Sequence, residues 1–116
     1  MAYGGNGTHD TLVGAGSDEH IGNEVRVAIA KLHSRGYVHG DIRDVNVVVK
    51  RSNLLHVVFV DWDWAGKNGE VEYPVSINPN IPRHSTAVGL APIEKIHDIF
   101  MFERLFPSLA SKEKEI

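Results

Sequence analysis

The chain lacks cysteine altogether, and that absence removes several classes of function at once. None of its 116 residues is Cys, so disulfide frameworks, thiolate metal sites and cysteine nucleophiles are excluded. Long apolar runs are missing too: the longest strongly apolar stretch covers residues 57–60, far too short to span a bilayer. The first residues are polar and glycine-rich, unlike a secretory signal. We therefore expect a soluble, cytoplasmic or nuclear protein without a membrane partner.

An excess of positive charge is also absent. Lys and Arg number 12 against 15 Asp and Glu, giving a net charge of −3. Such a chain has no basic field for nucleic acid, and we expect no nucleic-acid partner. The apolar fraction of 42% and the charged fraction of 23% are ordinary for a globular protein. The length suits a single domain.

Two periodic segments predict a helix followed by a β-hairpin. Residues 18–35 form the helix, because apolar residues recur at i, i+3, i+4 and i+7. That apolar stripe consists of Val25, Ala28, Ile29 and Leu32. Gly36 supplies a left-handed residue just beyond the helix. Residues 47–60 contain two mostly apolar strands joined by a turn, which is typical of a hairpin. The hairpin needs cover on one face, and the preceding helix is the candidate.

A second helix and three irregular segments complete the prediction, which is an α+β fold. The helix covers residues 92–106, with Pro92 in its first turn and an apolar stripe of Ile93, Ile96 and Phe100. Residues 65–91 are rich in Gly, Pro, Asn and Ser and form a long loop, functional or mobile. Residues 1–17 are expected to be a flexible arm and residues 108–116 a charged tail, leaving 18–107 as the folded unit.

Polar residues gather at both sides of the predicted hairpin. Residues 39–46 (HGDIRDVN) precede the first strand, and residues 61–63 (DWD) follow the second. In an antiparallel pair, Asn46 and Asp61 lie at the same end, with Asp41 a loop's width away. Their oxygens suit a hard cation such as Mg²⁺, completed by substrate phosphates. Taken singly, each could instead be a turn residue that bonds its own backbone.

The spacing of these clusters resembles that of protein kinases. Residues 32–49 (LHSRGYVHGDIRDVNVVV) resemble the catalytic segment, whose core pattern is H-R-D-L-x-x-x-N, and residues 60–63 (VDWD) stand where D-F-G is expected. The resemblance covers about residues 21–106. The run DWDWAGK at 61–67, followed by Tyr73 and Pro74, is most similar to the fungal-type protein kinases. The resemblance implies part of a kinase C-terminal lobe.

The same resemblance implies roles for four side chains. Asp41 matches the catalytic base that accepts the proton of the substrate hydroxyl. Asn46 and Asp61 match the residues that hold Mg²⁺ against the phosphates of ATP. Arg43 stands where the family usually has a lysine near the transferred phosphoryl group, a task that a guanidinium can perform.

Two further residues are implied as structural support for the site. His39 matches the catalytic-loop histidine, and Asp98 resembles the buried aspartate that bonds the backbone of that loop; an exposed helix charge is the alternative for Asp98. Gly40 departs from the pattern by replacing arginine, which puts activation by loop phosphorylation in doubt. Trp62 replaces phenylalanine, and its N–H needs a partner. Asp63 replaces the glycine of D-F-G.

The N-terminal lobe of a kinase, which holds ATP, has no counterpart in the sequence. No glycine-rich loop precedes Asp41, and Lys31, the one lysine upstream, lies in the predicted helix. The resemblance therefore implies a truncated domain whose family activity is ATP- and Mg²⁺-dependent phosphate transfer to a protein Ser or Thr hydroxyl. Because transfer depends on positioning, we expect no turnover by this chain alone. Its partners would be a protein substrate and the missing N-terminal lobe or a partner chain.

Two other functions stay open. The chain could be a non-catalytic kinase-like (pseudokinase) binding module, whose uncovered apolar face seeks a partner. Alternatively, Asp61-Trp62-Asp63 resembles the D-x-D metal site of nucleotide-sugar glycosyltransferases. That interpretation leaves residues 39–46 unexplained and lacks the alternating strand–helix pattern of those enzymes.

Overall fold

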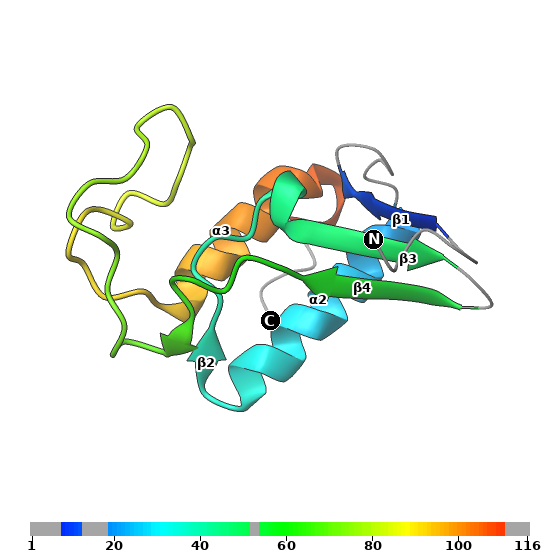
Figure 1. The fold of residues 1–116 in the computed structure, drawn as a ribbon, viewed down its shortest axis with the longest axis horizontal. Helices are drawn as coiled ribbons and strands as arrows, with labels where there is room; N and C mark the ends of the chain where they lie inside the picture. Colours follow the sequence, from blue (N-terminus) through cyan, green and yellow to red (C-terminus); the bar gives the residue numbers. More distant parts are fainter. Residues whose placement is uncertain (1–7, 13–18, 52–53, 111–116) are drawn as a thin grey trace.

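The computed structural model describes residues 8–12, 19–51 and 54–110, and these residues form an α+β fold. A three-stranded antiparallel sheet, in the order β1-β3-β4, packs against two helices, and a two-stranded ribbon pairs β2 with β5 (Figure 1). The elements are β1 (Thr8–Thr11), α2 (Glu19–Ser34), β2 (Tyr37–Val38), the 3₁₀ turn η1 (Asp44–Asn46), β3 (Val47–Arg51), β4 (Leu55–Phe59), β5 (Gly66–Lys67) and α3 (Lys95–Leu105). The predicted class is confirmed, and the arrangement is compatible with part of a kinase C-terminal lobe.

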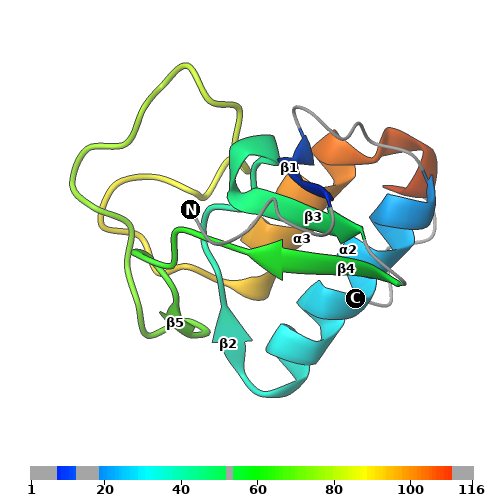
Figure 2. The same cartoon turned by 45° about the vertical axis from the view of Figure 1, so that its right-hand side comes forward.

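The hairpin β3–β4 forms where the sequence predicts it. Val47 lies opposite Phe59, and Arg51 lies opposite Leu55. Because side chains alternate along a strand, Val47, Val49 and Phe59 point into the core. The helix α2 packs against β4 and covers this inner face, as Figure 2 shows.

The predicted apolar stripe of the first helix is confirmed at Val25 and Ile29, whereas Leu32 is only partly buried. Val25 and Ile29 are fully buried, and Ala28 packs at the edge of the core. Gly36 follows the helix with a φ of 85°, the left-handed conformation that glycine adopts without steric cost. Neither helix in the described part of the chain is long and apolar enough to cross a membrane.

Part of the expected arm, residues 1–17, is a strand. Thr8–Thr11 pairs antiparallel with β3, with Thr11 opposite Val48, and Leu12 is buried in the core. The pairing depends on the free edge of β3, which local composition does not encode. Residues 1–7 and 13–17 lie outside the described residues. Leu109, within the expected tail 108–116, is also buried.

The second helix is shorter than the predicted span 92–106. Glu94 caps it: its side chain accepts a bond from the backbone N–H of His97, while the His97 ring accepts one from the backbone N–H of Glu94. The preceding residues are extended instead of helical, because the backbone N–H of Ile93 donates to the carbonyl of Val71 at 2.8 Å. A tertiary hydrogen bond therefore sets the start of α3.

The buried face of α3 also differs from the predicted stripe. Ile96 is 45% exposed, whereas Met101 and Phe102 are buried. Two polar residues, His97 and Asp98, share the buried face. Hydropathy alone predicts that His and Asp are exposed. The predicted stripe therefore lies about one residue away from the observed buried face.

The long loop between β5 and α3 is anchored at several points. It carries a small apolar cluster formed with β2, whose buried members are Val38, Tyr73, Ala87 and Ile93. Glu72 forms an isolated bridge with Pro92. The loop nevertheless extends well beyond the sheet (Figure 1). These contacts hold it in place where it borders the site.

We predict that Phe102→Ala destabilises the chain by about 3–5 kcal/mol, because it removes a fully buried ring from the core. Ile96→Ala, on the same helix, should change stability by less than about 0.5 kcal/mol. Urea unfolding followed by circular dichroism measures both variants. A larger loss for Ile96→Ala than for Phe102→Ala would contradict the observed face of α3.

Candidate functional site

Asp98 on α3 anchors the loop that precedes the hairpin. Its Oδ2 accepts the backbone N–H of His39 at 3.0 Å, and its Oδ1 accepts that of Gly40 at 2.9 Å. His33 on α2 lies 2.9 Å from Oδ2 through Nε2. Asp98 is fully buried, which excludes an exposed helix charge. The carboxylate thus joins two helices and the loop at one point.

His39 extends this anchoring to Val60, which follows β4. Its Nδ1 accepts the backbone N–H of Asp41 at 3.1 Å, so its Nε2 carries the proton and donates to the carbonyl of Val60 at 2.9 Å. The ring is buried and lies edge-on to Phe59 and Trp62. With both nitrogens engaged, His39 supports the loop and is unsuited to bind a metal.

Asp41 is held by three side chains. Its Oδ1 accepts bonds from Arg43 Nε and Arg83 Nη2, each at 2.9 Å. Its Oδ2 accepts a bond from Asn46 Nδ2 at 3.1 Å, and the same amide nitrogen donates to the carbonyl of Asp41 at 2.9 Å. The carboxylate is therefore fixed in orientation, with both oxygens engaged.

The hairpin brings Asn46 and Asp61 to the same end, as the sequence predicts. Val47 pairs with Phe59, and the backbone N–H of Val60 donates to the carbonyl of Asn46 at 2.9 Å. Asp61 follows directly and is exposed, with a φ of 59°. Few residues adopt this left-handed conformation, although Asp tolerates it better than most.

Three of the predicted site residues line one cavity of about 350 Å³. Asp41, Arg43 and Asp61 face it, together with Asp63 and Arg83. Asn46 is not among the lining residues, although it bonds Asp41 directly. The cavity combines three carboxylates with two guanidinium groups, which is a mixed charge distribution suited to a cation and an anion together.

The donor set fits Mg²⁺ only as a partial site. The Nδ2 of Asn46 is committed to Asp41, which leaves its Oδ1 as the atom that could meet a metal, and Asp61 adds a carboxylate. Both are the hard oxygen donors that Mg²⁺ prefers, with phosphates or water completing the shell. Within the described ranges, no group of three or more His, Asp or Glu side chains is placed to hold a metal.

The departures from the kinase pattern have structural reasons. Gly40 has a φ of 92°, and an added Cβ would lie 3.1 Å from Ile93 and 3.2 Å from the Cβ of Trp64. A side chain at position 40 would be strained in both respects. Trp62, in turn, finds the partner that its N–H needs, because it donates to the carbonyl of Phe59 at 2.9 Å.

Comparison with curated proteins finds a relative of partial extent. The chain is similar to a protein of Archaeoglobus fulgidus named "Probable serine/threonine-protein kinase BUD32 homolog", with 30% identity over 81 residues. The similarity suggests the protein-kinase-like superfamily. It covers 70% of this chain and 40% of the relative, so the chain spans well under half of that protein's length. No protein-family model matches the chain, and no solved structure matches it.

Sequence reasoning missed Arg83, whose guanidinium donates to Asp41 from 42 residues away. The guanidinium lies over the ring of Trp64, 5.1 Å from its centroid. One signal was available: Arg83 is the only Asp, Glu, Lys or Arg between Glu72 and Glu94. A single charge in a long polar loop is weak evidence by itself, and its partner is not local.

A chain of hydrogen bonds fastens the loop near Arg83 to α3. Since His97 Nδ1 accepts the backbone N–H of Glu94, its Nε2 carries the proton and donates to Thr86 Oγ1 at 2.8 Å. Thr86 Oγ1 lies 2.9 Å from His84 Nδ1, which also accepts the backbone N–H of Thr86. Burial, and then the neighbouring His84, lower the pKa of His97. This chain of bonds requires neutral rings.

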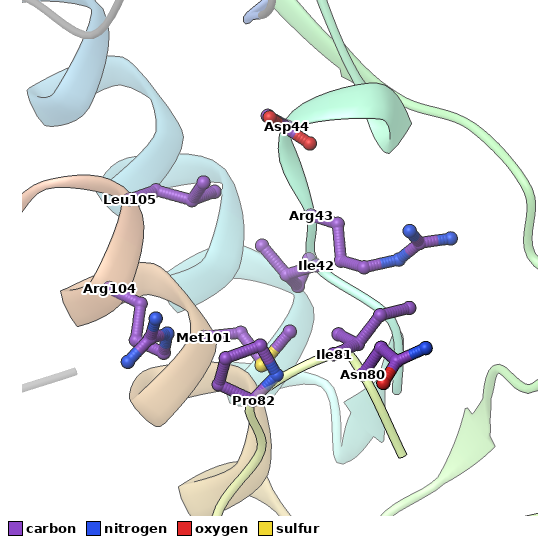
Figure 3. Close-up of a pocket in the computed structure, with 9 residues that line it drawn as sticks. All are labelled: Ile42, Arg43, Asp44, Asn80, Ile81, Pro82, Met101, Arg104 and Leu105. Atoms are coloured by element: carbon purple, nitrogen blue, oxygen red, sulfur yellow. The ribbon is translucent and has the colours of Figure 1, made fainter. Parts of the chain in front are cut away.

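A second cavity, of about 270 Å³, lies beside the first. Figure 3 shows its walls: Arg104 and Met101 on α3, Ile42 and Arg43 before η1, and the loop residues 80–82. The guanidinium of Arg43 extends away from α3, toward the side of the site that holds Asp41. Arg104 contributes only to this second cavity among the described pockets.

We expect Asp98→Asn to destabilise the fold by about 1–3 kcal/mol, because an amide turns one accepting oxygen into a donor facing a buried backbone N–H. Asp44→Asn makes the same chemical change at an exposed residue and should alter stability by less than about 0.5 kcal/mol. Chemical denaturation compares them. Equal effects of the two variants would refute the anchoring role of Asp98.

His97 should make stability depend on pH. A histidine whose pKa is lowered by folding binds more protons when unfolded. Its stabilising contribution is therefore complete above the ordinary value of 6.5 and falls as the pH drops below it. We expect the wild type to lose more stability than His97→Gln between about pH 7.5 and about pH 5.5. Urea titrations at both pH values measure this difference, and parallel losses would contradict it.

Proposed function

We propose that the chain provides the catalytic-loop half of a protein-kinase-like phosphotransferase site. The proposed reaction is transfer of phosphate from ATP, with Mg²⁺, to a Ser or Thr hydroxyl of a protein. The observation that carries the proposal is the convergence of Asp41 and Asp61 on one cavity, with Asn46 bonded to Asp41. The archaeal kinase-like relative supports the same class of chemistry.

In this proposal each residue has one task. Asp41 receives the proton of the attacking hydroxyl, and Asn46 and Asp61 would hold Mg²⁺. Bound Mg·ATP supplies the phosphoryl group and the charge neutralisation that its transfer needs. Arg43, whose side chain is 30% exposed, faces the cavity and stabilises charge on the transferred group.

Two residues keep the catalytic loop in place without touching the substrate. His39 and Asp98 together fix the backbone from position 39 to position 41. Their arrangement supports the finer proposal of a kinase C-terminal lobe. The proposed likeness to the fungal-type kinases rests instead on the run DWDWAGK at 61–67, followed by Tyr73 and Pro74. The remaining contacts to ATP would come from an N-terminal lobe or a partner chain, which the proposal requires for turnover.

A second candidate function is binding to another protein without catalysis. Exposed apolar side chains border a groove between α2 and β4, including Val58 at 49% and Trp62 at 47% exposure. Such a surface is typical of an interaction site when it is contiguous. This candidate predicts no Mg²⁺-dependent nucleotide binding, which separates it from the first.

We expect the chain to bind ATP weakly and more tightly with Mg²⁺ than in EDTA, measured by calorimetric titration under both conditions. Asp61→Ala and Asn46→Ala should each weaken this binding by at least about tenfold, because each removes an oxygen ligand of the metal. Asp44→Ala removes a neighbouring exposed carboxylate and should leave the affinity within about twofold.

The other functions predict different results in the same experiment. Absence of any Mg²⁺-dependent binding would favour the non-catalytic module. Preference for a sugar nucleotide with Mn²⁺, lost in Asp63→Ala as well as in Asp61→Ala, would favour the D-x-D glycosyltransferase. Circular dichroism of each variant establishes that a lost signal reflects the site and not the fold.

A further inference from the structure

Arg83 is buried with unused hydrogen-bonding capacity. Its side chain is 6% exposed, although its loop neighbours Asn80 and Pro82 are exposed. A guanidinium has five N–H donors. Nη2 donates to Asp41, whereas Nε and Nη1 are buried without a partner among the described residues. Leaving charged donors unpaired in this way is unfavourable, so the arrangement calls for an acceptor.

The pairing with Asp41 does not account for Arg83. Arg43 already donates to the same oxygen of Asp41, and Asn46 donates to the other. Two guanidinium groups therefore converge on a single carboxylate oxygen, where they repel each other. A second anion beside them would relieve that repulsion and use the idle donors.

The position of Arg83 depends on more than Asp41. Trp64 lies beneath the guanidinium, with its ring centroid 5.1 Å away, and Tyr73 packs against Trp64 in a T-shaped arrangement with ring centroids 5.6 Å apart. The next residues of the loop are tied to α3 through Thr86 and His97. The loop can thus stay in place while the guanidinium exchanges one acceptor for another across the cavity that it lines.

We propose that Arg83 and Arg43 form an anion subsite that takes a phosphate group, and that Arg83 moves from Asp41 onto that phosphate when the cavity fills. The phosphate could belong to a nucleotide or be a free inorganic anion. A phosphate offers more acceptor oxygens than the shared Oδ1 of Asp41, and it matches the guanidinium fork. The exchange also leaves Asp41 Oδ1 with one guanidinium donor, that of Arg43, in place of two. As regards the nucleotide, this inference rests on the proposed function.

The test uses pyrophosphate, added in EDTA so that no metal site contributes. Calorimetry of the intact chain should give saturable binding, and Arg83→Gln should weaken it by at least about tenfold, the loss typical of a charge-assisted hydrogen bond. Arg104→Gln removes the same charge from the second cavity (Figure 3) and should bind within about twofold of the wild type. Repeating the titration with ADP in EDTA distinguishes a nucleotide phosphate from a free anion.

Arg83→Lys guards against a folding artefact. It keeps the positive charge but loses the planar fork, so it should fold and bind pyrophosphate more weakly than the wild type. Trp64 gives an independent signal, because its fluorescence in a Trp62→Phe background should change with pyrophosphate unless Arg83 is replaced. If pyrophosphate produced no Trp64 fluorescence change that depends on Arg83, this would count against the exchange.

The outcome separates this inference from the proposed function. Asp61→Ala should abolish Mg²⁺-dependent ATP binding and retain pyrophosphate binding in EDTA. The anion subsite is overturned if Arg83→Gln and Arg104→Gln bind pyrophosphate equally, or if the wild type shows no saturable binding up to about 10 mM. Neither result would by itself alter the case for a metal site at Asp61.

Discussion

The rest of the site depends on the buried carboxylate of Asp98. A charge without solvent contact is tolerated only when donors surround it, and Asp98 receives the backbone N–H groups of His39 and Gly40 together with the ring of His33. These bonds fix a segment that lies 58 and 59 residues earlier in the chain. They hold Gly40 in its left-handed conformation and so determine where Asp41 begins. These bonds orient the loop toward the hairpin.

From Asp98 a continuous path of hydrogen bonds leads through His39 to Val60, the residue before Asp61. His39 accepts the backbone N–H of Asp41 and donates to Val60, and Val60 donates to Asn46. One neutral histidine therefore connects the candidate base to the residue just before the candidate metal ligand. The path explains how an exposed aspartate with a φ of 59° can keep a defined position: the residues before it are fastened on both sides. Local strain of this kind persists only where the surroundings determine it.

The sequence was sufficient for features that depend on local order. The stripe of α2 and the hairpin follow from apolar periodicity, and the shared end of Asn46 and Asp61 follows from antiparallel pairing. Features that depend on distant partners were not accessible. The strand Thr8–Thr11 exists because β3 offers an edge, and α3 begins late because Val71 holds Ile93. The role of Arg83 was not predicted for the same reason, since its partner Asp41 is 42 residues away.

The glycine at position 40 and the arginine at position 83 are two parts of one arrangement. The kinase pattern has an arginine at position 40, where the left-handed φ of this chain would strain any side chain and a Cβ would lie 3.1 Å from Ile93 and 3.2 Å from Trp64. Trp64, one of the two residues that a Cβ at position 40 would meet, also lies against the guanidinium of Arg83, 5.1 Å from its ring centroid. Arg83 thus brings a positive charge to Asp41 from the long loop between β5 and α3. Because Arg83 belongs to that loop, its bond to Asp41 joins the loop directly to the cavity that both residues line.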